Sequence, residues 1–180
     1  MLNVDNIDFT TLYNGAAKLV QMYRQELERQ KVNASGALSN SADFDVDFNE
    51  NNIVLYFIYN SYGFYVEKGR KPTGGGAGQP WTNSIQELEQ WIKNKMAKGW
   101  FVPKQNREIP RSPQEIRRVA YAIRRKIHTL GWYGELGQHY GLHILESVLN
   151  QAEASGLIQQ MVDSVVSGYE KEITAEIAKI

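Results

Sequence analysis

Residues 53–78, with the sequence IVLYFIYNSYGFYVEKGRKPTGGGAG, constrain the fold more than any other part of the chain. The first seven of them, Ile53–Tyr59, are aliphatic or aromatic and predict a buried β-strand. Five glycines and a proline follow between Gly69 and Gly78, and these residue types favour a flexible loop, expected over residues 69–80. A strand that leads into such a loop, with no catalytic signature, indicates a protein that assembles with partners.

The residues before this segment predict a helix followed by a β-hairpin. Apolar residues recur at steps of three and four from Phe9 onward, so an amphipathic helix is expected from Phe9 to about Val32, capped by Asp8. Aspartates alternate with apolar residues over 43–48, which is typical of a strand with one face in water. Residues 49–52 are turn formers, so this strand and the next should pair as a hairpin.

Two helix starts further along the chain carry complete capping signals. Ser84 with Glu87, and Ser112 with Glu115, match the capping box, in which both side chains satisfy N–H groups of the first helical turn. Pro113 occupies the first helical position after Ser112, where its fixed φ suits a helix. Apolar periodicity predicts two last helices at 142–155 and 158–177.

These patterns together predict an α+β fold with an N-terminal helix, an antiparallel β-hairpin or small sheet with a long glycine-rich loop, and several C-terminal helices packed against it. At 180 residues and 42% hydrophobic, the chain is expected to form one domain over 1–180, with an extended connection at 100–111. No apolar stretch approaches the roughly 20 residues of a membrane span, so no membrane partner is expected. The absence of cysteine excludes disulfides and thiolate catalysis.

Charge is segregated along the chain although the formal net charge is zero. Residues 1–67 carry 4 basic and 9 acidic side chains, residues 68–126 carry 14 and 4, and residues 127–180 carry 2 and 7. Such a distribution favours either a surface that faces a polyanion or contacts between opposite faces of identical subunits in a ring.

Three motifs follow one another in the first half of the chain. They are the amphipathic N-terminal helix, ASGALSNS at Ala34–Ser41 and YGFYVEKG at Tyr62–Gly69. In this order they resemble the tail-completion, or head-to-tail joining, proteins of long-tailed bacteriophages. Those neck proteins show a helix, a Gly-Leu-Ser-like turn, a β-hairpin, a tyrosine-valine-glutamate-glycine stretch, a variable loop and C-terminal helices. The chain departs from them at Gly137–Gly141, where GQHYG replaces a small-residue and proline pattern.

The resemblance implies a virion structural protein of a tailed bacteriophage, located in the neck or tail after assembly in the host cytoplasm. Such a subunit forms a homo-oligomeric ring that joins the portal-connector to the tail and surrounds the DNA passage. Its partners would be portal or connector proteins, tail proteins and, without sequence specificity, genomic DNA. The subunit-interface candidates are Tyr62, Phe64, Tyr65, Glu67, Gly69, Arg70 and Lys71.

A basic stripe is expected on the helix that begins at Pro113. At about 100° per residue, four arginines fall on the side opposite the apolar residues. This stripe could be solvated or paired with acidic parts of another copy, or it could contact DNA phosphates. The alternative function is therefore a stand-alone nucleic-acid-binding protein that uses the basic helix 113–129. The stripe consists of Arg117, Arg118, Arg124 and Arg125.

Other motifs with chemical potential do not fit their templates. The aspartates of residues 43–47 match the start of a calcium loop, but Phe48 occupies the position that requires glycine. Residues 69–78 lack the Gly-Lys-Ser/Thr ending of a phosphate-binding loop, and His139 and His143 lack the glutamate of a zinc protease motif. With no nucleophile elbow or cysteine nucleophile either, we expect no metal, no cofactor and no enzymatic activity.

Overall fold

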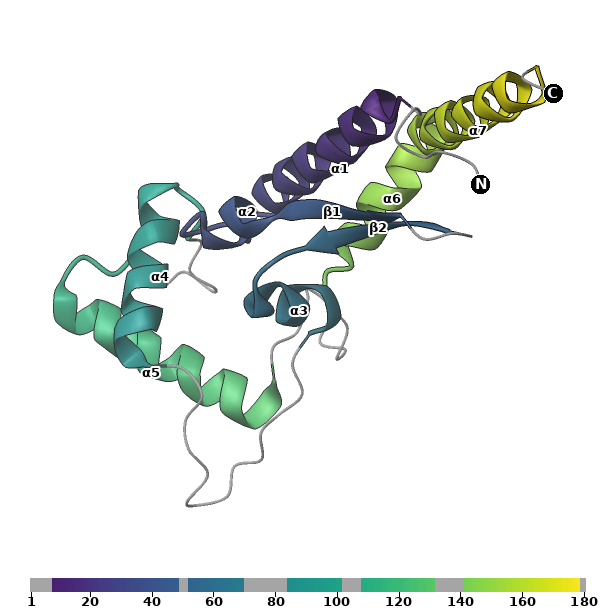
Figure 1. Ribbon diagram of the computed structural model, residues 1–180. Helices are drawn as coiled ribbons and strands as arrows, with labels where there is room; N and C mark the ends of the chain where they lie inside the picture. The colour runs from purple at the N-terminus through teal and green to yellow at the C-terminus, as the bar shows by residue number, and fades with distance from the viewer. Residues whose placement is uncertain (1–7, 49–51, 70–83, 102–107, 132–140, 179–180) are drawn as a thin grey trace. The chain divides into compact units, whose positions relative to one another are not determined.

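The computed structural model describes residues 8–48, 52–69, 84–101, 108–131 and 141–178 (Figure 1). In these ranges the predicted α+β fold class is confirmed, because helices accompany a two-stranded antiparallel sheet. The elements are α1 Thr10–Arg29, α2 Ala37–Ser41, β1 Asp43–Phe48, β2 Ile53–Ile58, α3 Ser61–Lys68, α4 Ile85–Ala97, α5 Pro113–Leu130, α6 Ile144–Ala154 and α7 Leu157–Ile177.

Contacts between residues divide the chain into two compact units. The first unit contains residues 1–26, 41–59 and 144–180, and the second contains residues 27–40 and 60–143. The first unit therefore holds the sheet, most of α1, and α6 with α7, whereas the second holds α3, α4 and α5. The expectation of a single domain stays a prediction.

The predicted N-terminal helix is confirmed, although α1 ends at Arg29 instead of near Val32. At its start, the carboxylate of Asp8 accepts a hydrogen bond from the N–H of Thr10 at 2.9 Å, as expected of a cap. Near its end, Lys31 adopts a positive φ of 56°, which turns the backbone out of the helix. The apolar face of α1 packs within the first unit and buries Leu12, Ala16, Leu19, Val20 and Tyr23.

The predicted hairpin is present, with Phe44 opposite Phe57 in an antiparallel register. Its inner face packs on α1, where the ring of Tyr23 lies 5.0 Å from that of Phe57, measured between centroids. The expectation that Ile53–Tyr59 is a buried strand was wrong, since Tyr56 and Ile58 of β2 are 49% and 47% exposed. A two-stranded sheet that packs one face on a single helix leaves its other face to solvent.

The segment between the strand and the glycine-rich loop contains a helix that the sequence analysis did not predict. α3 begins after Asn60, whose side chain caps the helix by accepting a hydrogen bond from the N–H of Gly63 at 3.3 Å. Part of the predicted turn at Ala34–Ser41 is likewise helical, as α2. The expected loop over 69–80 lies outside the described residues beyond Gly69, as do residues 102–107 of the expected connection.

α4 and α5 pack against each other in the second unit, and both predicted capping boxes are formed. Ser84 and Ser112 each accept a hydrogen bond from the N–H of the glutamate three residues later, while that glutamate binds back to the serine N–H. The interface between the helices is a compact apolar cluster. Its buried members are Ile85, Leu88, Ile92, Ile116 and Ala120.

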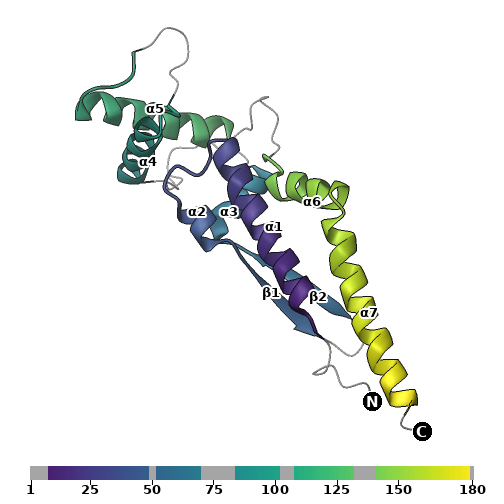
Figure 2. The same ribbon diagram turned by 90° about the horizontal axis from the view of Figure 1, so that it is seen from above.

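The last two predicted helices, α6 and α7, are also confirmed, and a sharp bend joins them (Figure 2). Gly156 lies at this bend with a φ of 74°, a conformation that glycine adopts without strain. At the start of α7, Met161 is buried and packs against Gly15 of α1, where a Cβ atom would overlap the methionine side chain. This close approach fastens α7 to α1 within the first unit.

Candidate interaction surfaces

The outer side of the sheet places an acidic row beside an apolar row. Asp43, Asp45 and Asp47 of β1 pair in register with Ile58, Tyr56 and Val54 of β2. The N–H groups of Phe44 and Val46 donate to the carboxylates of the preceding aspartates, at 2.9 Å in both cases. β2 has no charged residue and no proline, and in the described residues it pairs with β1 alone. The strand β2 therefore lacks the charged side chains and the proline that often prevent an edge strand from pairing.

α3 carries the interface candidates of the YGFYVEKG motif, and it divides them between surface and interior. Phe64 and Tyr65 lie on the surface, with 57% and 43% of their area exposed and their ring centroids 6.0 Å apart. Tyr62 is half-buried, and desolvation raises its pKa to about 12. Glu67 is buried. Among these residues of α3, Phe64 and Tyr65 therefore form the exposed apolar surface.

The C-terminal end of α3 is closed by the backbone of residues 141–143. The N–H of Leu142 donates to the carbonyl oxygen of Val66 at 2.8 Å, and that of His143 donates to the carbonyl of Glu67 at 3.4 Å. Gly141 lies so close to Glu67 that a Cβ atom would overlap its carbonyl group. Gly69 follows the helix with a φ of 73°. Arg70 and Lys71, the remaining interface candidates, lie outside the described residues.

The four arginines of the predicted basic stripe lie on α5, and three of them are exposed. Arg117, Arg118 and Arg125 are exposed, whereas Arg124 is half-buried. Tyr121 lies among them and is 51% exposed. Arg117 Nε lies 3.8 Å from Glu89 Oε1, a long and exposed ion pair that contributes little. The surface is thus available to an anionic partner.

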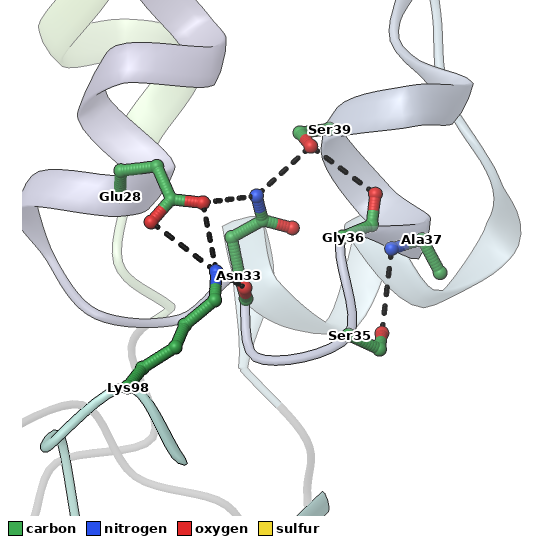
Figure 3. A network of polar contacts seen from close by, with 7 residues as sticks. All are labelled: Glu28, Asn33, Ser35, Gly36, Ala37, Ser39 and Lys98. Carbon is green, nitrogen blue, oxygen red and sulfur yellow. Dashed lines mark hydrogen bonds and ion pairs between the residues drawn. The ribbon is translucent and has the colours of Figure 1, made fainter. Parts of the chain in front are cut away.

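A network of polar contacts joins the ends of α1 and α4 in the second unit (Figure 3). Lys98 Nζ donates to Glu28 Oε1 at 3.1 Å and to the carbonyl oxygen of Asn33 at 2.8 Å. Asn33 Nδ2 in turn donates to Glu28 Oε1 and to Ser39 Oγ. Lys98 also lies over the ring of Trp100, 4.3 Å from its centroid. Because each contact links chain segments of the same unit, we interpret the network as structural.

α7 exposes apolar side chains along one face in the first unit. Their spacing of four, seven and four residues places them together on a helix. The face that packs lies about 120° around the helix from this stripe, with Met161 and Glu172 buried. The exposed apolar residues are Val162, Val166, Ile173 and Ile177.

Chemical sites are not evident in the part of the chain that the structure describes. There, no group of three or more His, Asp or Glu side chains could hold a metal ion. No helix within the described ranges is long and apolar enough to cross a membrane. Comparisons with protein-family models, curated proteins and solved structures found no match for the chain. The surfaces themselves therefore carry the functional argument.

The sequence placed the aromatic pair of α3 among the interface candidates, but the helix that carries it was not predicted, although Asn60-Ser61 is an ordinary helix-start signal. The apolar stripe of α7 was interpreted only as evidence for a helix, since periodicity does not tell which side a neighbour will cover. The role of Gly141 had no signal beyond the presence of a glycine.

Proposed function

We propose that this protein is a virion structural protein of a tailed bacteriophage, a neck or tail-completion subunit that forms a ring joining the portal-connector to the tail. The order of elements supports the proposal, because an N-terminal helix, a hairpin, the YGFYVEKG motif and C-terminal helices follow one another as in the family it resembles. The observation that carries self-assembly is the edge of β2, which in the described residues pairs with β1 alone and has no charge or proline.

The edge of β2 suits assembly better than that of β1. A strand edge offers unpaired N–H and C=O groups, to which another chain can add by extending the sheet. Along β1, the carboxylates of Asp43 and Asp45 accept hydrogen bonds from the N–H groups of the next residues. These carboxylates also place negative charge along the strand. Growth of the sheet is therefore directed to β2, where the exposed Tyr56 and Ile58 add apolar contact area.

The exposed rings of α3 provide a second contact for a neighbouring subunit. Phe64 and Tyr65 follow β2 by a few residues, and adjacent aromatic residues on a surface are typical of the centre of a protein interface. In this proposal β2 supplies backbone pairing, and the two rings supply desolvated apolar area. Charge segregation would then orient neighbouring copies around the ring.

The experiment that tests the viral role is imaging of particles produced without this protein. If the protein is a neck subunit, particles produced without it should be DNA-filled heads without attached tails, together with free tails. Wild-type protein supplied from a plasmid should restore joined particles. Particles that keep their tails in the absence of the protein would rule the proposal out.

A paired variant tests the sheet edge in the same assay. Tyr56→Lys with Ile58→Lys places two ammonium groups on exposed positions of β2, and charged side chains at an edge oppose strand pairing. We expect loss of joined particles with little loss of stability. The matched control, Asp43→Asn with Asp45→Asn, changes exposed residues of β1 and should still complement.

The alternative function, stand-alone nucleic-acid binding, is favoured by the exposed Arg117, Arg118 and Arg125 of α5. Arginines that neutralise phosphates release counterions, so binding to duplex DNA should weaken steeply as salt increases. Titration of a fluorescent duplex at about 50 mM and at about 200 mM salt tests this, with roughly a thousandfold loss expected for six or more phosphate contacts. If no binding to duplex DNA is detected at about 50 mM salt, stand-alone nucleic-acid binding is ruled out.

A further inference from the structure

Two acidic side chains lie along one side of the apolar stripe of α7. Val166 is 49% exposed, and the exposed carboxylates of Asp163 and Glu170 lie three residues before it and four residues after it. At 100° per residue both carboxylates fall on the same flank of the stripe. They are separated by seven residues, or about 10.5 Å along the helix axis. The side chain of Asp163 also accepts a hydrogen bond from Gln159 Nε2 at 2.7 Å.

α5 repeats this spacing with the opposite charge. Tyr121 is 51% exposed, and the exposed guanidinium groups of Arg118 and Arg125 lie three residues before it and four residues after it. They occupy the same flank relative to Tyr121 as the carboxylates do relative to Val166. When two such faces pack in antiparallel directions, their matching flanks meet. Asp163 then lies opposite Arg125, and Glu170 lies opposite Arg118.

The charges of the two compact units are opposite as a whole. The first unit, which contains α7, carries 4 basic and 13 acidic side chains, a formal charge of −9. The second unit, which contains α5, carries 16 basic and 7 acidic side chains, a formal charge of +9. Long-range attraction between a first unit and a second unit of different copies would therefore favour the same pairing as the local charges.

We propose that α7 of one copy packs antiparallel on α5 of a second copy, with Val166 against Tyr121 between the two charge pairs. The inference rests on the self-assembly part of the proposed function and specifies a contact for it. The two surfaces that meet are different, so the first copy keeps its α5 surface free and the second copy keeps its α7 surface free. Such a head-to-tail contact continues into a ring when its rotation closes and into a filament when it does not.

Charge reversal provides the test, because all four charged residues are exposed. One variant carries Asp163→Lys and Glu170→Lys, and the other carries Arg118→Glu and Arg125→Glu. Sedimentation velocity should show that the wild type assembles as its concentration increases. In each variant alone, the dissociation constant of assembly should rise by about tenfold or more. Mixing the two variants in equal amounts should restore assembly, because each variant then finds a partner surface of opposite charge.

The matched controls are Lys126→Glu on α5 and Glu153→Lys on α6, exposed positions outside both faces. Both should assemble as the wild type does. Assembly that persists in each double variant, or mixtures that stay dissociated, would overturn the inference. So would a wild-type chain that stays monomeric up to about 1 mM, a concentration at which even weak specific contacts are populated. In that case, the imaging of particles without the protein would still decide the neck function separately.

Discussion

Gly141 shows how one residue can join segments that are far apart in the sequence. Its backbone lies against the carbonyl of Glu67, and the next residue, Leu142, donates to the carbonyl of Val66. The last carbonyl groups of a helix have no partner within it, so these contacts satisfy groups that would otherwise need water. Only a residue without a Cβ atom fits at this distance.

Gly141→Ala should therefore destabilise the protein by about 1–3 kcal/mol, the usual cost of forcing extra atoms into a packed site. Urea unfolding followed by circular dichroism measures this loss. Gly156→Ala is a useful control, because no atom lies within 4 Å of its Cβ position and only the strain of a positive φ is added. Equal stability of Gly141→Ala and the wild type would show that the close contact is absent in solution.

Tyr62 should make the stability depend on pH in the alkaline range. Desolvation raises the pKa of its hydroxyl group from 10.0 to about 12 in the folded state. The folded protein therefore keeps a proton that the unfolded chain releases, and stability falls as pH rises from 10 towards 12. Its contribution is complete below pH 10.

Tyr62→Phe should make this alkaline fall less steep. Urea midpoints measured between pH 9 and pH 12 for the variant and the wild type provide the test. Tyr56→Phe changes an exposed tyrosine and serves as the control. Parallel pH profiles for Tyr62→Phe and the wild type would contradict the prediction.

At the scale of elements, the α4–α5 pair was the most predictable part of the chain. Each helix begins with a complete capping box, and the apolar residues of each recur on one face. Local signals thus determine both helices, and their apolar faces have an obvious partner in each other. α3 was less predictable, because its eight residues include a glycine and two tyrosines that fit other structures equally well.

Ile92→Ala should be one of the most destabilising single substitutions in the second unit. Its side chain is fully buried at the centre of the α4–α5 cluster, and loss of a buried isoleucine costs about 2–5 kcal/mol through lost burial and a cavity. The neighbouring exposed Lys93→Ala should change stability by about 0.5 kcal/mol or less. Chemical unfolding of both variants tests the difference. A loss of stability in Ile92→Ala as small as that in Lys93→Ala would mean that the cluster contributes little to stability.

At the scale of the whole molecule, zero net charge conceals two units of −9 and +9. Division of the sequence into thirds already showed segregation, but the unit boundaries cut the chain elsewhere. The acidic N-terminal and C-terminal segments come together in the first unit, so folding concentrates a charge that the sequence distributes. This separation of charge between the two units favours contact with a surface of complementary charge in one orientation.

Self-association should consequently weaken as salt is added. The Debye length shortens from about 10 Å at 0.1 M to about 3 Å at 1 M, which screens attraction between oppositely charged units. Light scattering at fixed protein concentration over this range should show a decreasing mean mass. Glycerol added in place of salt controls for viscosity and should leave the mass unchanged. An increasing mass would indicate that apolar contacts alone drive association.

The sequence by itself determined the helices with capping signals, the hairpin and the α+β class, because those depend on neighbours within a few residues. It also indicated the arginine face of α5, since helical periodicity alone places those residues together. Tertiary structure alone decided that β2 is half exposed, that Gly141 closes α3 and that the apolar stripe of α7 faces outward. Each of these depends on which distant segment covers a surface, and no local pattern encodes that choice.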